Sequence, residues 1–239
     1  MSRAAKGAWC ALALCIALLP ASPALALAAT VLQASRCGLV VADHSGSTVS
    51  VRYVGLPANQ PVSYANFIAL WPSSVVPWTV PPTVRQALVS NTETGSQVLS
   101  QVSIGALAYT LTYAVGPEVA DTCASALIGA DGSTGVVDAV TLELVDVGAS
   151  TLTFRYHTLS GYRPAQAGNW IGLWRGRVSP YNAPAYLAKS LIASDVTDDV
   201  IAFNDVTLQP GSIYTAVYFM DESSTSAAAL LTFRVASGG

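Results

Sequence analysis

Apolar and polar residues alternate with a period of two along several short segments of this chain. Within residues 49–53, two valines and a tyrosine alternate with a serine and an arginine, and residues 152–156 repeat the pattern. This alternation is typical of β-strands that are buried on one face. Residues 109–113 and 214–218 also favour strands, because tyrosine, threonine and apolar residues fill them. No segment of ten or more residues carries a helical stripe, so the pattern predicts an all-β protein with only a helical turn or two.

The same pattern occurs twice along the chain. At a shift of 103 residues, segment 48–90 aligns with segment 151–193 without a gap, and 13 of the 43 positions are identical. Ordinary composition gives about one chance match in fifteen, so the alignment indicates an internal duplication. Its clearest stretch pairs residues 66–71 with Asn-Trp-Ile-Gly-Leu-Trp at 169–174.

Each copy carries about seven short predicted strands in about 100 residues, which is the strand number of an immunoglobulin-like sandwich. The sequence therefore predicts two tandem immunoglobulin-like antiparallel β-sandwiches, at residues 29–128 and 136–239. Residues 129–135, Gly-Ala-Asp-Gly-Ser-Thr-Gly, have the composition of a linker between them.

The N-terminus has the three parts of a secretory signal peptide. Arg3 and Lys6 precede an apolar run at 8–19, and small residues follow at 24–28. The apolar run is about a dozen residues, short of the roughly 20 that a membrane span needs, and no later segment is long and apolar enough. We therefore expect cleavage of residues 1–28 and a secreted or periplasmic protein.

Cleavage leaves two cysteines, Cys37 and Cys123. Two thiols in an oxidising compartment favour a disulfide over free thiols. Because Cys37 falls in the first predicted strand of the first copy and Cys123 in its last, we expect the bond to tie these strands together.

The charge of the chain argues against a nucleic acid or an anionic membrane as the partner. The full chain has a formal net charge of −3, which becomes more negative once Arg3 and Lys6 are removed. The remaining basic residues are scattered singly, apart from Arg175 and Arg177, so no basic stripe indicates nucleic acid or an anionic membrane. Charged residues are only 10% of the chain, which favours extended neutral contacts.

A resemblance follows from the second copy. The Asn-Trp-Ile-Gly-Leu-Trp segment stands after Thr-Leu-Thr-Phe-Arg-Tyr and before Leu-Gln-Pro-Gly at 208–211. This arrangement resembles the SKICH-type immunoglobulin-like sandwich and the β-sandwich domain that precedes the catalytic domain of some metallophosphatases. The resemblance implies the fold and an accessory domain that docks or targets something. It carries no catalytic residue across, and no following enzymatic domain is present in this sequence.

Candidate catalytic and metal sites are few. His44 lies in Asp-His-Ser-Gly-Ser, which we interpret as a hairpin tip rather than a triad, and His157 is expected to face solvent. No zinc spacing or phosphate-binding glycine loop is present. Four acidic residues could offer oxygen ligands to calcium, although a solvated loop is the favoured interpretation. These residues are Asp195, Asp198, Asp199 and Asp205. We therefore predict no cofactor and no metal.

Aromatic residues gather around one strand of each copy and the proline-rich loop after it. They are Trp71 and Trp78 in the first copy, and Trp170, Trp174, Tyr181 and Tyr186 in the second. In the second copy Ile171 and Leu173 occupy one strand face and the tryptophans the other. Only one face can point into a two-layer core, so a loop, the other domain or a partner must cover the second.

We expect a binding surface of the second domain at Trp174, Arg175, Arg177 and Tyr181. Gly172 would leave a shallow gap between two indoles, where a sugar face or an apolar side chain could stack beside the guanidinium groups. The alternative is that both tryptophans are core residues. A binding surface requires that Trp174 or Tyr181 be substantially exposed, whereas a core requires that the tryptophans be buried.

These observations predict a secreted, non-enzymatic binding or structural module that contacts a carbohydrate, a protein or itself. A self-assembling surface subunit is an alternative, because open edge strands can pair between copies. A hydrolase with an unrecognised site is the less favoured third, because only two histidines are available.

Overall fold

The computed structural model describes residues 28–237, so the predicted signal peptide lies, apart from its last residue, outside the described residues. The described chain forms sixteen strands and two three-residue 3₁₀ helices, η1 (Val119–Asp121) and η2 (Pro180–Asn182). The all-β prediction is therefore confirmed. None of the described helices has the length and apolar character needed to cross a membrane.

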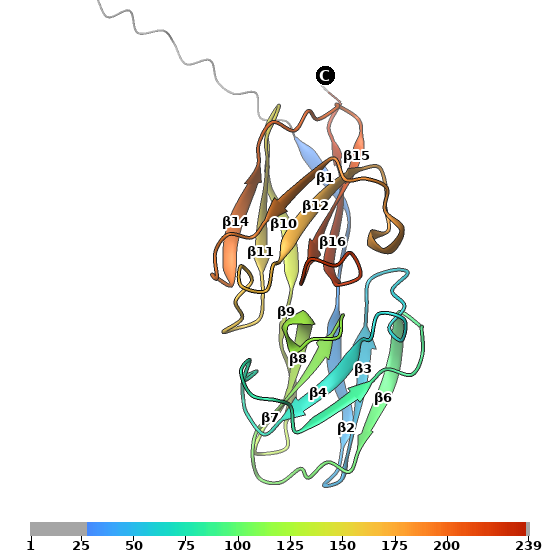
Figure 1. Ribbon diagram of the computed structural model, residues 1–239, viewed down its shortest axis with the longest axis vertical. Coiled ribbons are helices and arrows are strands. Elements are labelled where there is room, and N and C mark those ends of the chain that lie inside the picture. Colours follow the sequence, from blue (N-terminus) through green and yellow to red (C-terminus); the bar gives the residue numbers. More distant parts are fainter. Residues whose placement is uncertain (1–27, 238–239) are drawn as a thin grey trace, which may run out of the picture.

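The strands form two antiparallel sandwiches, which lie end to end in Figure 1. In the first, the sheet β2-β3-β6 faces the sheet β5-β4-β7-β8-β9. Its strands are β2 (Gly38–His44), β3 (Thr48–Val54), β4 (Phe67–Trp71), β5 (Val84–Ala87), β6 (Thr94–Ser100), β7 (Tyr109–Ala114), β8 (Thr122–Ile128) and β9 (Thr134–Ala139).

The second sandwich repeats this order, with the sheet β10-β11-β14 facing the sheet β13-β12-β15-β16-β1. The two immunoglobulin-like sandwiches thus agree with the predicted duplication, and the strands that carry Ile68 and Ile171 occupy the same place. The strands of the second sandwich are β10 (Thr141–Val147), β11 (Leu152–His157), β12 (Trp170–Arg175), β13 (Ala188–Leu191), β14 (Asp198–Phe203), β15 (Ile213–Phe219), β16 (Ala227–Val235) and β1 (Ala29–Arg36).

The period-two pattern produces half-buried strands, as predicted. In β3 the side chains of Val49, Val51 and Tyr53 are buried, whereas Arg52 between them is exposed. The central strands β4, β7, β12 and β15 differ, because they are buried on both faces. Their sequences are correspondingly apolar or aromatic at nearly every position.

The first strand of each copy belongs to the other copy's sandwich. β1 pairs with β16 at the far end of the chain, and β9 pairs with β8 of the first copy. The predicted boundaries at 29–128 and 136–239 therefore differ from the observed division. The first sandwich uses residues 38–139, and the second uses 141–235 together with β1.

The predicted linker at 129–135 is the turn of the β8–β9 hairpin. Gly129 N–H donates to Ser133 O at 2.7 Å, and Gly132 occupies a left-handed conformation with φ of 79°. Asp-Gly is a common hairpin dipeptide for this reason. Linkers and hairpin turns share glycine and small polar residues, so composition alone does not distinguish them.

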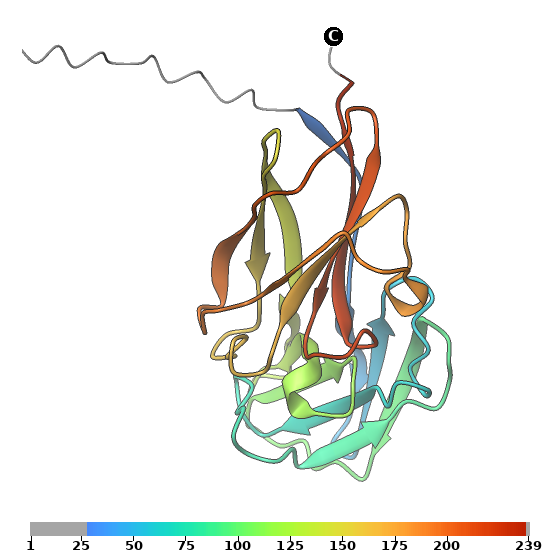
Figure 2. The ribbon, with the colours of Figure 1, turned by 45° about the horizontal axis from the view of Figure 1, so that its top comes forward.

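Two nearly continuous strands, β1–β2 and β9–β10, each run from one sandwich into the other and connect them. Only Cys37 separates β1 from β2, and only Val140 separates β9 from β10. At these crossings Cys37 N–H donates to Ala228 O at 2.9 Å, and Val140 N–H donates to Cys123 O at 2.8 Å. Both long strands pass between the halves in Figures 1 and 2. Separating the halves would require pulling β1 and β9 from their sheets.

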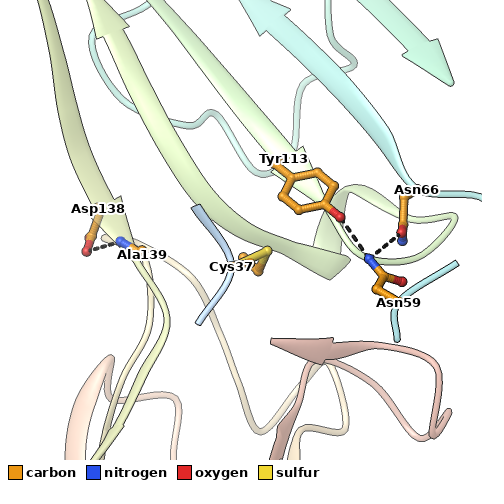
Figure 3. Close-up of a disulfide and its surroundings, with 7 residues drawn as sticks. Cys37, Asn59, Asn66, Tyr113, Asp138 and Ala139 are labelled. Carbon is orange, nitrogen blue, oxygen red and sulfur yellow. Dashed lines mark hydrogen bonds between the residues drawn. A yellow bond between two sulfur atoms is a disulfide. The ribbon is translucent and has the colours of Figure 1, made fainter. Parts of the chain in front are cut away.

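The predicted disulfide is confirmed. Cys37 and Cys123 are bonded, with Cα atoms 6.1 Å apart, and both are fully buried. Cys37 stands at the crossing after β1, so the bond fixes one of the two crossings to β8, as Figure 3 shows for Cys37. Val140 and Ala228 occupy the corresponding places at the other crossing.

The loops that precede the two central strands have the same conformation. Asn66 N–H donates to Pro61 O, and Asn169 N–H donates to Pro164 O. Positive φ angles occur at Ala58 and Ala65, and again at the equivalent Gly161 and Gly168. These two loops, 56–66 and 159–169, are called the first and second junction loops, because both reach the boundary between the sandwiches.

Buried asparagines hold these loops, with Asn66 in the first and Asn169 in the second. Asn59 Nδ2 donates to Asn66 Oδ1 at 3.1 Å and to the Tyr113 hydroxyl at 2.9 Å (Figure 3). In the second copy Tyr218 donates its hydroxyl proton to Asn169 Oδ1 at 2.7 Å. Asn66 and Asn169 are fully buried, and these side-chain hydrogen bonds tie the loops to the tyrosines of β7 and β15.

Candidate functional site

The expected platform on β12 is not formed, because its tryptophans are core. Trp174 and Trp170 are each only 4% exposed, and Trp170 stacks on Phe219 with ring centroids 4.0 Å apart. Trp174 Nε1–H donates to Pro184 O at 2.8 Å. Leu56 of the first sandwich belongs to the same cluster. The second apolar face is therefore covered both by the protein's own loop and by the other sandwich.

Gly172 also has a different role from the one expected. A Cβ atom at this position would overlap the rings of Trp170 and Trp174. The glycine leaves no open gap, because the two indoles close over it. The sequence correctly identified the missing side chain, but it could not show that neighbouring rings use the space.

The other expected binding residues lie apart from one another. Arg175 and Arg177 are exposed, and Arg177 lines a cleft of about 220 Å³ together with Ala58 and Ser179. Tyr181 is half-buried and stacks on Tyr64 of the first junction loop, with centroids 5.2 Å apart and planes 18° apart. Burial raises the pKa of the Tyr181 hydroxyl well above its usual value. Tyr181 therefore joins the two sandwiches and offers no open stacking face.

Trp78 has the corresponding place on the opposite side of the boundary. At the shift of 103 residues it aligns with Tyr181. Its Nε1–H donates to Ser160 O at 2.9 Å, and its ring lies 4.8 Å from that of Tyr162. Each sandwich thus sends one aromatic side chain to the junction loop of the other. The alignment of Trp78 with Tyr181 in the sequence is a signal that predicts this pairing.

A cleft opens beside Trp78. It has a volume of about 570 Å³ and lies between the loop after β4 and the second junction loop. Trp78 is only partly buried there, whereas Tyr162 is buried beneath it. The polar side chains of its lining are Thr79, Tyr162, Arg163 and Gln166. A partly apolar cleft with a few polar groups at a junction is the usual form of a ligand site.

Asp121 lies next to this cleft, at the end of η1 beside the lining residue Ala120. Burial, together with the nearby negative charges of Asp221 and Glu118, raises the pKa of the Asp121 carboxyl from its ordinary 3.8 to about 7. The hydrogen bond that Asp121 Oδ2 accepts from Glu118 N–H, 2.7 Å long, acts in the opposite direction.

Within the described residues, neither histidine ring forms a hydrogen bond with a serine, threonine or tyrosine hydroxyl. His44 Nε2 lies 3.0 Å from Gly132 O, between two hairpin tips. His157 was expected to face solvent, but it is half-buried between sandwiches, with Nε2 2.7 Å from Asp138 Oδ1 and Nδ1 3.7 Å from Asp198 Oδ2. Asp138 stands on β9 and His157 on β11, so strand exchange creates this contact.

The four acidic residues considered for calcium do not converge. Asp198 pairs with Arg155 at 2.8 Å, Asp195 accepts from Gln166 N–H, and Asp199 accepts from Val200 N–H. Asp205 occupies a turn with φ of 59°. Between residues 28 and 237 no group of three potential ligands is positioned for a metal ion.

Comparisons with known proteins address the fold alone. No protein family and no curated protein matches the sequence. Among solved structures, the chain is similar to the human OSCAR ligand-binding domain, at 15% identity and a TM-score of 0.23, over 82% of this chain and 94% of that one. It is also similar to the FN1-FN3 domains of chicken CNTN1, at 11% identity and a TM-score of 0.26, over 91% and 68%. Neither is a SKICH-type or metallophosphatase domain, so that resemblance stays a prediction.

Proposed function

We propose that this protein is a secreted or periplasmic binding module, without enzymatic activity, that binds its ligand in the cleft beside Trp78. The observation that carries the proposal is the cleft itself, which combines a partly exposed indole with polar groups from both sandwiches. Trp78 and Thr79 come from the first sandwich, whereas Arg163 and Gln166 come from the second. The site exists only while the two halves are joined.

Rigidity of the junction supports this function. Two strand crossings, a buried disulfide and two aromatic contacts hold the cleft walls in place. A preformed site binds more tightly than one whose walls must be ordered by the ligand. The predicted signal peptide and the disulfide both favour an oxidising compartment outside the cytoplasm. The resemblance to SKICH-type domains would fit the same role, because those domains act as accessories that dock onto something.

Hydrogen exchange tests the proposal. The mature protein would be mixed with polysaccharide and protein fractions of the producing cells, kept separate, and exchange would be followed by mass spectrometry. We expect one fraction to slow exchange in residues 77–80 and 159–167. Slower exchange elsewhere, with none in these loops, would place the ligand on another surface and contradict the proposal.

A further inference from the structure

The two sides of the junction share one backbone construction, and one of the side chains in which they differ is a tyrosine on the first junction loop. On one side Tyr181 stacks on Tyr64 of the first junction loop. On the other side Trp78 meets the second junction loop, where the residue equivalent to Tyr64 is Ala167. Because the loops have the same backbone hydrogen bonds, this difference is one of side chain and not of loop shape.

The small side chain of Ala167 leaves room beside Trp78, because both residues line the same cleft. Tyr64 fills the place beside Tyr181 with a second ring, whose centroid lies 5.2 Å from that of Tyr181. Where Ala167 replaces that ring, Trp78 borders a cleft of about 570 Å³ and stays partly exposed. Tyr64 lies within 18° of parallel to Tyr181, so the space beside Trp78 suits a ring that lies against the indole.

Polar groups around the space point to a ring that carries hydroxyls. Arg163 is exposed, and its Nη1 makes only a long contact of 3.5 Å with Gln166 Oε1. Thr79 adds a hydroxyl on the facing wall. These groups offer both donors and acceptors, which an aromatic side chain of a protein would leave without partners and a sugar would satisfy.

The surrounding charges favour a neutral ring. Asp195 accepts a hydrogen bond from Gln166 N–H at 3.0 Å, and Glu222 lies against Gly168, next to Ala167. Both acids are exposed near the cleft. One guanidinium, Arg163, therefore stands among carboxylates, and an acidic sugar would meet repulsion there.

We propose that a neutral pyranose ring of a carbohydrate binds in this cleft, stacked on Trp78 in the space that Tyr64 fills on the other side. Its hydroxyls would bond to Arg163 and Gln166. This inference rests on the proposed function and names the class of its ligand. Stacking of a sugar face on an indole combines apolar contact with room for hydroxyls at the rim.

Ala167→Tyr is the direct test, because it adds the ring that the first junction loop already carries and leaves Trp78 in place. Saturation-transfer NMR and titration would use defined oligosaccharides of neutral hexoses, with uronate oligosaccharides in a second arm. We expect the wild-type protein to bind a neutral oligosaccharide and the variant to bind at least about tenfold more weakly. The uronates should bind more weakly than the neutral sugars.

Arg177→Ala is the matched control, because Arg177 lines the smaller cleft across the junction. It should bind the oligosaccharide as the wild-type protein does. Thermal unfolding must show that Ala167→Tyr stays folded. If it does not fold, Gln166→Ala takes its place, with the same expected loss of binding.

The remaining outcomes separate the failure of the sugar site from the failure of the binding module. Binding that survives Ala167→Tyr places the sugar elsewhere and overturns the pyranose site. No binding of any neutral oligosaccharide overturns it as well. If a protein fraction nevertheless slows exchange in the cleft loops, the binding module stands and only the ligand class is wrong. If no fraction does so, the proposed function falls too.

Discussion

At the scale of single residues, Trp174 illustrates how a side chain can fit two interpretations equally well in the sequence. A tryptophan two residues after a glycine on a strand is compatible with an exposed platform and with a covered core. In the structure Trp174 is a core residue, because Leu56 of the other sandwich packs in the same cluster and the loop after β12 covers the ring. Neither neighbour is close in sequence, so periodicity could not reveal them.

Replacement of Trp174 by alanine should therefore destabilise the protein without a specific effect on a binding surface. We expect a loss of about 3 to 5 kcal/mol in the free energy of unfolding, as for other buried aromatic residues. Denaturant unfolding of the mature protein measures it. Arg175→Ala on the same strand is the control and should change stability by less than about 0.5 kcal/mol. Near-wild-type stability of the Trp174 variant would show that the ring is not core.

The junction loops allow a matched pair of backbone substitutions. Ala65 has φ of 56° and the equivalent Gly168 has φ of 73°, a region that costs a residue with a Cβ roughly 1 to 2 kcal/mol. Gly168→Ala should therefore lower the free energy of unfolding by about 1 kcal/mol, whereas Ala65→Gly should leave it unchanged or raise it. Equal losses in both variants would mean that the two loops do not share a conformation.

Asp121 should make stability fall as pH rises. Its carboxyl has a pKa of about 7 in the folded protein against an ordinary 3.8, so between these values the folded state retains a proton that the unfolded chain has released. The free energy of unfolding should decrease across that interval, by up to roughly 4 kcal/mol. Asp121→Asn should flatten the profile, because the amide still accepts from Glu118 N–H and never ionises.

Denaturant unfolding at a series of pH values between about 3.5 and 8 measures this profile. Asp221→Asn serves as a second variant, since it removes a nearby negative charge that raises the Asp121 pKa. It should reduce the slope without abolishing it. A slope that Asp121→Asn leaves unchanged would assign the pH dependence to another group.

At the scale of strands, the local sequence pattern predicts where a strand lies but does not predict which other strand pairs with it. The alternation at Val49, Val51 and Tyr53 places β3 correctly, because burial of alternate residues follows from the strand alone. The partner of β1 could not be inferred, because it is β16 at the opposite end of the chain. Asp131-Gly132 was assigned to a linker, although the same dipeptide closes a hairpin.

Edge strands bear on the alternative of self-assembly. Among the outer strands, β1, β2, β9 and β10 each carry a bulge or an irregular register, and β5 and β13 have only four residues. Bulges and short edges are devices that hinder edge-to-edge pairing. The remaining outer strands, β6 and β14, are regular and have seven and six residues, so assembly through open strands would have to use these two.

The disulfide should stabilise the crossing of β1 and β2 strongly. It closes a loop across 86 residues, which in the chain-entropy model contributes about 4 to 5 kcal/mol. The double variant Cys37→Ala with Cys123→Ala should lose about that amount in the free energy of unfolding, and reductant should not change it further. Mass spectrometry of the non-reduced wild-type protein should find no free thiol in the mature chain. Two free thiols would contradict the bond.

At the scale of the whole molecule, the exchange of β1 and β9 makes the two sandwiches one unit. Each long strand leaves one sheet and enters another across a single residue, and the two ends of the described chain meet where Ala236 N–H donates to Ala28 O at 2.7 Å. Both aromatic contacts across the junction are reciprocal in the same way. This arrangement is that of a strand-exchanged dimer whose two subunits have been joined into one chain.

Two fragments of the first copy should therefore behave differently. Residues 37–139 contain β9, which pairs with β8 as a hairpin, so this fragment has every strand of its sandwich and should be monomeric. Residues 29–128 lack β9 but keep β1, the equivalent strand of the duplication, with no β16 to pair with. We expect β1 of one molecule to add to β8 of another, which would give a dimer that imitates the full chain.

Sedimentation equilibrium of both fragments, purified with the disulfide intact, distinguishes these states. The dimer of 29–128 should dissociate when β1 is shortened to begin at residue 34, because most of its backbone pairs are then lost. If 29–128 is a monomer, or if 37–139 forms a dimer as well, exchange of the first strand does not explain the association. Association of separate fragments would then depend on the aromatic contacts rather than on strand exchange.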